Sequence, residues 1–82
     1  ETQKATDLLN HLIAESENYI DWAFSLGDNR IEVVQRDCLY RFWQWNQCNE
    51  LLKNMDKERY EQSNQQFEKK YMRLTQLMNY HN

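Results

Sequence analysis

His11 stands between two carboxylates at helical spacing, with Asp7 four residues before it and Glu15 four residues after it. On a helix these three side chains would lie on one face, and nitrogen and oxygen ligands of this kind bind divalent metals. The only other histidine is His81, close to the C-terminal end, and no His-Glu-x-x-His or Cys-x-x-Cys pattern is present. We therefore expect a solvated polar face, with no metal site and no other cofactor.

Glu17 and Asp21 form a second carboxylate pair one helical turn apart, a geometry that general acid-base catalysis can use. Any acidic helix surface shows the same spacing, and a chain of 82 residues has little room for an enclosing pocket. The one glycine, Gly27, cannot by itself build a phosphate-binding loop. We expect no catalytic residues and a protein that is not an enzyme.

Cys38 and Cys48 lie ten residues apart within one expected helix. About 15 Å of axial rise would separate them there, so they cannot form a disulfide with each other. We expect two small buried thiols in a reducing compartment. A reactive thiol, or a disulfide between two copies of the chain, stays open as the alternative.

The composition is that of a helical protein. The chain contains no proline, and β-branched residues are few. The residues Leu, Gln, Glu, Lys and Asn are abundant. Hydrophobic residues make up 40% of the chain, too much apolar surface for disorder, and the length fits one domain, 1–82. No apolar run reaches the length of a membrane span, and the first residues lack the layout of a signal peptide. We expect a cytoplasmic protein without a transmembrane segment.

Three amphipathic segments, at about 4–26, 30–53 and 57–79, cover most of the chain. In each, apolar residues recur at alternating spacings of three and four, as on one helical face. We predict an all-α fold, a small antiparallel bundle of three helices, which coiled-coil-like packing could extend to a dimer. The stripe of the first segment contains Leu9, Leu12, Ser16, Tyr19 and Ala23, with Ile13 and Ile20 on its flank; that of the third contains Tyr60, Asn64, Phe67, Tyr71, Leu74, Met78 and His81.

The ends of these helices carry their own signals. Gly27 stands where a residue with positive φ closes a helix, and Asn29 with Glu32 has the form of a capping box for the next one. Asp56 can cap the third helix, so we predict a turn near 53–56. The alternative is one helix of about 50 residues from Asn29, which would have to dimerise to bury its apolar seam.

Charge is unevenly distributed. Residues 1–28 carry six acids and one lysine, a net charge of −5, whereas residues 29–82 carry a net charge of +2. This asymmetry favours contacts between helices of opposite charge. It does not favour DNA, which requires clustered Lys and Arg on one face.

The middle segment is apolar on several sides. Val33, Tyr40 and Leu51 fall about 120° from its main stripe, and Trp43 occupies a further sector. One stripe cannot bury all four rings of 40–45, so Tyr40 or Trp43 should reach the surface, where such residues are favoured anchors for partners. The alternative, that all four rings belong to the core, stays open.

Arg41 falls inside the main stripe of the middle segment. We expect its aliphatic stem to pack while its guanidinium reaches water or an acid of the first helix such as Asp21. The alternative is a charged residue that sets the register of a dimer.

These patterns predict a non-enzymatic regulatory or adaptor protein that binds a protein partner, either as a homodimer or on a larger target. Size and style suit an inhibitor or modulator encoded by a phage or mobile element. The alternatives are a structural coiled-coil oligomerisation module and, against the charge pattern, a nucleic-acid-associated factor. The predicted interface residues are Val33, Tyr40, Arg41, Trp43, Leu51, Phe67, Tyr71 and Leu74.

Overall fold

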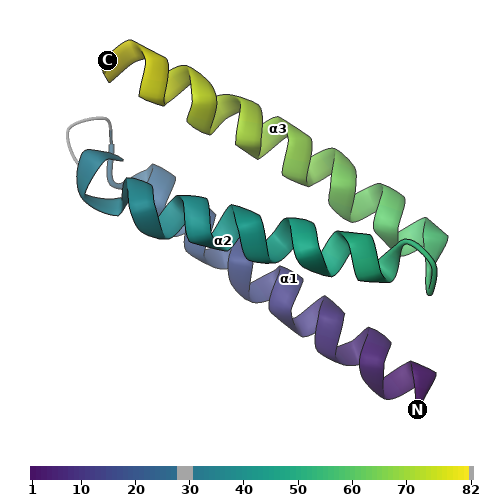
Figure 1. Ribbon diagram of the computed structural model, residues 1–82. Helices are drawn as coiled ribbons and strands as arrows, with labels where there is room; N and C mark the ends of the chain where they lie inside the picture. Colours follow the sequence, from purple (N-terminus) through teal and green to yellow (C-terminus); the bar gives the residue numbers. More distant parts are fainter. Residues whose placement is uncertain (28–30, 82) are drawn as a thin grey trace.

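The computed structural model describes residues 1–27 and 31–81, and within them the side chains of all except 31–34, 80 and 81. These residues form three α-helices, α1 (Thr2–Ser25), α2 (Ile31–Leu52) and α3 (Lys57–His81), which confirms the predicted all-α bundle (Figure 1). The bundle is long and narrow, 44 × 16 × 16 Å. No helix of the described chain has an apolar stretch long enough to cross a bilayer.

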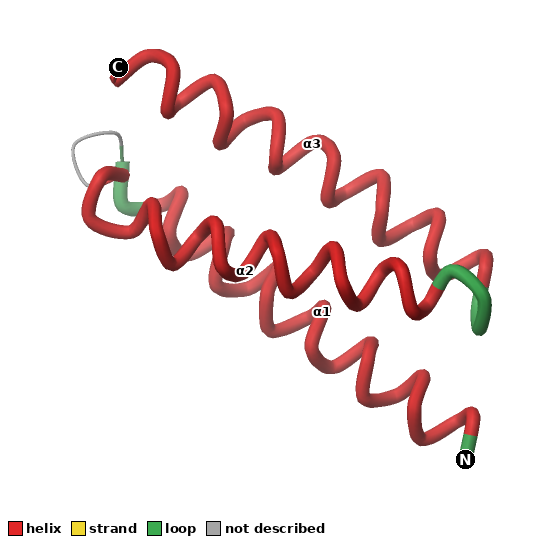
Figure 2. Tube along the Cα trace, viewed as in Figure 1, coloured by secondary structure: helices red, strands yellow, loops and turns green. Residues whose placement is uncertain are grey.

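The helices run up, down and up, so that α2 is antiparallel to both α1 and α3 and the two termini lie at opposite ends (Figures 1 and 2). Gly27 closes α1 with a φ of 87°, as its position predicted. A left-handed φ favours glycine because any Cβ would crowd the following carbonyl. The capping box predicted at Asn29 and Glu32 falls outside the residues whose side chains are described.

The chain turns between α2 and α3 at 53–56, as predicted, so the alternative of one long helix is wrong. The amide of Asp56 still donates to the carbonyl oxygen of Leu52 at 2.8 Å, and the side chain of Asp56 then begins the next helix. Its Oδ1 accepts a hydrogen bond from the backbone N–H of Arg59 at 3.1 Å. This satisfies one of the amides that have no partner in the first turn of a helix.

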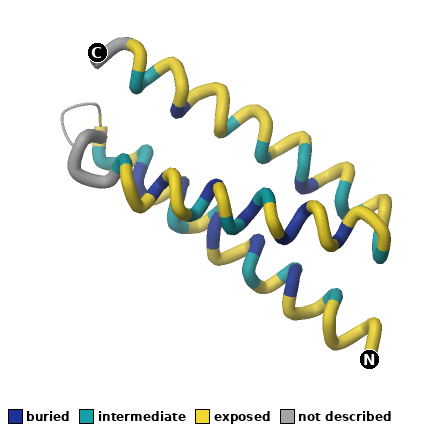
Figure 3. The backbone as a smooth tube through the Cα atoms, in the orientation of Figure 1, coloured by how far each residue is buried: buried dark blue, intermediate teal, exposed yellow. Residues whose placement is uncertain are grey.

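The core comes mainly from α1 and α2, while α3 is largely exposed (Figure 3). Ile13 and Ile20, which the sequence placed on the flank of the α1 stripe, are fully buried, and Leu12 and Tyr19 are only half-buried. The buried side of α1 is therefore displaced towards this flank, where α1 packs mainly on α2. The buried apolar residues are Leu9, Ile13, Ile20, Ala23, Cys38, Phe42, Trp45, Cys48, Leu52 and Leu74.

Helices α1 and α3 are joined by long basic side chains. The Arg59 guanidinium donates from Nε to Asn10 Oδ1 at 3.0 Å, and Lys70 Nζ pairs with the carboxylate of Asp21. Both contacts join residues 49 apart in sequence. A shared separation means that the two helices are parallel and keep one register. One of the two contacts, that of Asp21 with Lys70, joins opposite charges, as the charge asymmetry of the sequence favoured.

Candidate protein-binding face

Helices α1 and α3 cover one side of α2 and leave the other side open. Phe42 and Trp45 are fully buried, whereas the side chains of Tyr40 and Trp43 are each 58% exposed. The rings alternate between inside and outside because residues three apart share a helical face. The prediction that Tyr40 or Trp43 reaches the surface is confirmed for both, and the alternative that all four rings lie in the core is wrong.

The buried rings join α2 to α3. Phe42 contacts Phe67 and Tyr71 edge to face, with ring centroids 5.6 and 5.3 Å apart. Trp45 makes the same kind of contact with Phe67 at 5.4 Å. Edge-to-face rings attract because the positive ring edge meets the negative face. These ring contacts hold α2 and α3 together beneath the outer surface that the two helices share.

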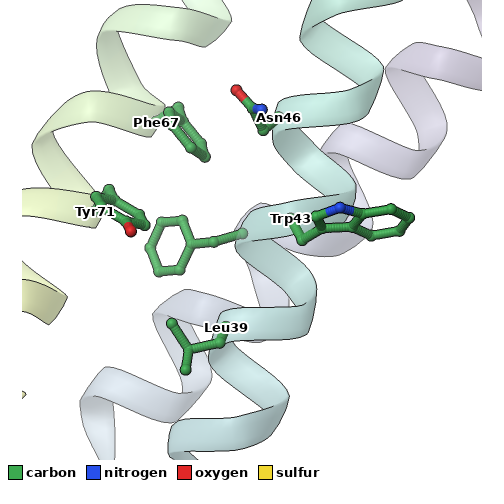
Figure 4. A pocket seen from close by; sticks show the side chains of 6 residues that line it. Leu39, Trp43, Asn46, Phe67 and Tyr71 are labelled. Carbon is green, nitrogen blue, oxygen red and sulfur yellow. The ribbon is translucent and has the colours of Figure 1, made fainter.

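A groove runs along the outer surface between α2 and α3. Part of it is a hollow of about 330 Å³ lined by Leu39, Phe42, Trp43, Asn46, Phe67 and Tyr71. In Figure 4, Phe67 and Tyr71 of α3 lie on the side of α2 opposite to the Trp43 ring, which points away from them. A second hollow of about 210 Å³ shares Leu39 and Tyr71 with the first, so the two form one groove. None of the described residues that line it is charged: Leu39, Phe42, Trp43, Asn46, Phe67, Tyr71, Leu74, Thr75, Met78 and Asn79.

The uncovered side of α2 borders this groove. We call it the outer face of α2, and it consists of Arg36, Leu39, Tyr40, Trp43, Gln47 and Glu50, all of them exposed. The rings of Tyr40 and Trp43 lie together, with centroids 6.0 Å apart. The face therefore has an apolar centre with a positive charge towards one end and a negative charge towards the other.

The structure separates the predicted interface residues other than Arg41 into three groups. Trp43, Phe67, Tyr71 and Leu74 all line the groove, although Leu74 is buried and contributes to its floor. Tyr40 lies beside Trp43, and Leu51 is exposed but does not line the groove. The side chain of Val33 is outside those described. Whether these residues bind a partner stays a prediction.

Arg41 lies against an aromatic ring of α1. Its guanidinium carbon lies 5.1 Å from the ring centroid of Tyr19, and its Nη1 donates to Gln44 Oε1 at 3.3 Å. Asp21 instead pairs with Lys70, because Arg41 and Tyr19 meet where α1 packs on α2 while Asp21 faces α3. Asp21, the acid named as one possible partner, is therefore not the partner of Arg41, whereas the half-buried Arg41 side chain packs within the bundle as expected.

The buried polar residue Ser63, between α2 and α3, was not predicted from the sequence. The predicted seam of α3 passed through Asn64, but Asn64 is half-buried and the buried residue of that turn is Ser63. Ser63 bonds to both Trp45 and Asn49. The spacing of apolar residues cannot predict the burial of Ser63, because serine is a polar residue and does not belong to an apolar stripe. The available signal was the indole N–H of a tryptophan in the seam, which needs an acceptor when buried.

The residues first considered for chemistry lie apart from this face. His11 Nε2 is 3.1 Å from Glu15 Oε1 on an exposed turn, and Asp7 accepts a hydrogen bond from Gln3 instead. Within the described part of the chain, no three metal-ligating side chains come together. The arrangement around His11 is local pairing on a solvated surface.

Both thiols are buried and free. Burial raises the pKa of Cys38 to about 11, and the nearby carboxylate of Asp37 adds to the effect. Burial also raises the pKa of Cys48. Because the thiolate is the nucleophile, both cysteines are held in their unreactive form at neutral pH.

Comparison of the chain with protein-family models, with curated proteins and with solved structures finds no match.

Proposed function

We propose that this chain is a regulatory or adaptor module that acts by binding another protein chain through the outer face of α2 and the adjoining groove, without catalysis. One observation carries the proposal: the Tyr40 and Trp43 rings lie together in the open beside an uncharged groove. Single exposed apolar residues are common on protein surfaces, but a contiguous patch of them marks an interaction site. Tyr and Trp are also the residues that most often dominate binding energy.

The charges around this surface favour a protein over a nucleic acid. A nucleic-acid interface needs several Lys or Arg side chains aimed at phosphates. Here Arg59 and Lys70 are turned towards α1 and engaged there, and the outer face of α2 offers one base, Arg36, with one acid, Glu50. An apolar surface with few charges suits a partner that presents apolar side chains.

The cysteines bear on where this binding takes place. Cys38 and Cys48 are both free thiols, which suits a reducing compartment, and we propose the cytoplasm.

A photoreactive side chain introduced at Leu39, in the groove, tests the proposal in extracts. The same group at Asn18, an exposed position of α1, is the matched control. We expect crosslinks to a polypeptide from position 39 and not from position 18. Because Trp43 borders the groove and its ring is more than half exposed, Trp43→Ser should reduce these crosslinks by roughly tenfold while leaving the helical circular dichroism unchanged.

Two results would contradict a protein-binding role. Equal crosslinking from positions 39 and 18 would mean that the groove has no specific occupant. A crosslinked species that nuclease removes would identify a nucleic acid as the partner.

A further inference from the structure

We infer that the occupant of this face is a second copy of the chain, with α2 packed antiparallel on α2 of the second copy and Trp43 beside a twofold axis. This inference rests on the proposed function and adds the identity and orientation of the partner.

The charges of the outer face are placed symmetrically about its aromatic centre. Arg36 lies seven residues before Trp43, and Glu50 lies seven residues after it. Seven residues are close to two helical turns, so the three side chains share one face, with each charge about 10 Å from the centre along the helix. All three side chains are exposed.

Such a face is complementary to itself only in one orientation. A half-turn about an axis at Trp43 brings Arg36 of each copy against Glu50 of the other, which gives two opposite-charge pairs from one rotation. A parallel arrangement would instead set Arg36 against Arg36 and Glu50 against Glu50. Twofold interfaces repeat every contact in this way, and complementary charges fix their register.

The apolar centre supplies area on the scale of a stable dimer. Between the two charges lie Leu39, Tyr40 and Trp43, with the 45% exposed ring of Tyr71 on the neighbouring helix. A large aromatic side chain buries roughly 150–250 Å², so the exposed parts of these four residues offer on the order of 400–500 Å² per copy. With a polar rim added, this approaches the ~800 Å² per partner of a standard interface.

Charge reversal at the two ends tests the arrangement directly. Sedimentation equilibrium in the presence of reductant should show a dimer for the unchanged chain. Arg36→Glu places two acids against each other, and Glu50→Arg places two bases against each other. We expect each substitution to raise the dimer dissociation constant by roughly tenfold or more, since like charges facing each other at an interface are unfavourable.

Mixing the two variants is the decisive step. A heterodimer of the Arg36→Glu chain with the Glu50→Arg chain has opposite charges at both ends, so an equimolar mixture should dimerise again although each variant alone does not. The double variant should dimerise by itself. Lys4→Glu and Glu61→Arg change the net charge equally at other exposed positions and should leave the dissociation constant unchanged.

Several outcomes would overturn this inference. A chain that stays monomeric at all concentrations rules out the dimer, and a dimer indifferent to both reversals, or a mixture that stays monomeric, rules out this orientation. A dimer that forms without reductant and dissociates when reductant is added would be held by a disulfide between two copies. If the chain is monomeric but its Leu39 derivative still crosslinks another polypeptide, the proposed function stands and the second copy alone is excluded; if no crosslink forms either, both fail.

Discussion

Trp45 Nε1 donates a hydrogen bond to Ser63 Oγ across the interface of α2 and α3, with 2.7 Å between the two atoms. Ser63 Oγ then donates to Asn49 Oδ1 at 2.7 Å, so one hydroxyl acts as acceptor and donor at once. All three side chains are buried. Among the described residues, Asn49 Nδ2 is the buried side-chain atom that has no hydrogen-bond partner.

Removing the hydroxyl of Ser63 should therefore be costly. Ser63→Ala leaves the indole N–H of Trp45 and Oδ1 of Asn49 unpaired in the core, and we expect a loss of about 1–3 kcal/mol in the free energy of unfolding, measured by urea denaturation. Ser16→Ala is the matched control. Ser16 is equally buried, but its hydroxyl bonds to the Leu12 carbonyl of its own helix, so its loss leaves no donor unpaired. Equal losses for the two variants would contradict the role given to Ser63.

Truncating two neighbouring aromatic residues of α2 should change the stability of the fold by very different amounts. Phe42→Ala removes a fully buried ring and should destabilise the fold by about 3–5 kcal/mol. Trp43→Ala removes a ring that is more than half exposed and should change the stability of the isolated chain by less than about 1 kcal/mol. Thermal unfolding at a concentration where the chain is monomeric makes the comparison. A large loss for Trp43→Ala would mean that its ring supports the fold and does not serve an interface.

The stability of the fold should depend on alkaline pH through Cys38. Its pKa is raised from 9.0 to about 11, so the folded state keeps the proton where the unfolded chain loses it. Stability is therefore intact below about pH 9, falls as the pH rises towards about 11 and levels off above that, with a loss of up to about 3 kcal/mol. The raised pKa values of Cys48 and Tyr19 act in the same direction.

Urea midpoints between pH 8 and pH 11.5 measure this dependence. Cys38→Ala removes the titrating thiol and should flatten the curve, whatever it costs in packing. An unchanged slope in that variant would assign the pH dependence to the other groups.

The cap of α3 can be tested by two substitutions at one position. Asp56→Ala removes the oxygen that accepts from the Arg59 amide and should cost about 1 kcal/mol. Asp56→Asn keeps an accepting oxygen and should lose much less. Chemical denaturation ranks the two variants, and similar losses would show that the charge of Asp56, and not its hydrogen bond, stabilises the helix.

Much of this fold could be predicted because the residues that begin and end a helix can be recognised in the local sequence. Gly27 and Asp56 mark helix ends through backbone conformation and one hydrogen bond, which depend on neighbouring residues only. The exposure of Tyr40 and Trp43 was predictable for a similar reason, since helical periodicity forbids burying them with Phe42 on one stripe.

What the sequence could not supply is how the helices are rotated and paired. The buried centre of α1 at Ile13, the partner of Arg41 and the burial of Ser63 all depend on which side each helix turns to the others. The groove has the same origin: its walls come from two helices, and Leu39 and Tyr71 meet across it only once their register is set.

The separation of 49 residues along the chain between the contacting residues of α1 and α3 also affects the order in which the helices pack during folding. The Trp45–Ser63 and Asn49–Ser63 contacts close loops of 18 and 14 residues, whereas Arg59 and Lys70 reach partners 49 residues away. Closing the longer loop costs about 1 kcal/mol more in chain entropy, so the α2–α3 hairpin should form before the third helix docks on α1. In stopped-flow experiments, Lys70→Ala should leave the refolding rate nearly unchanged and speed unfolding. The basic side chains of α3 then join this helix to α1 after the contacts between α2 and α3 have formed.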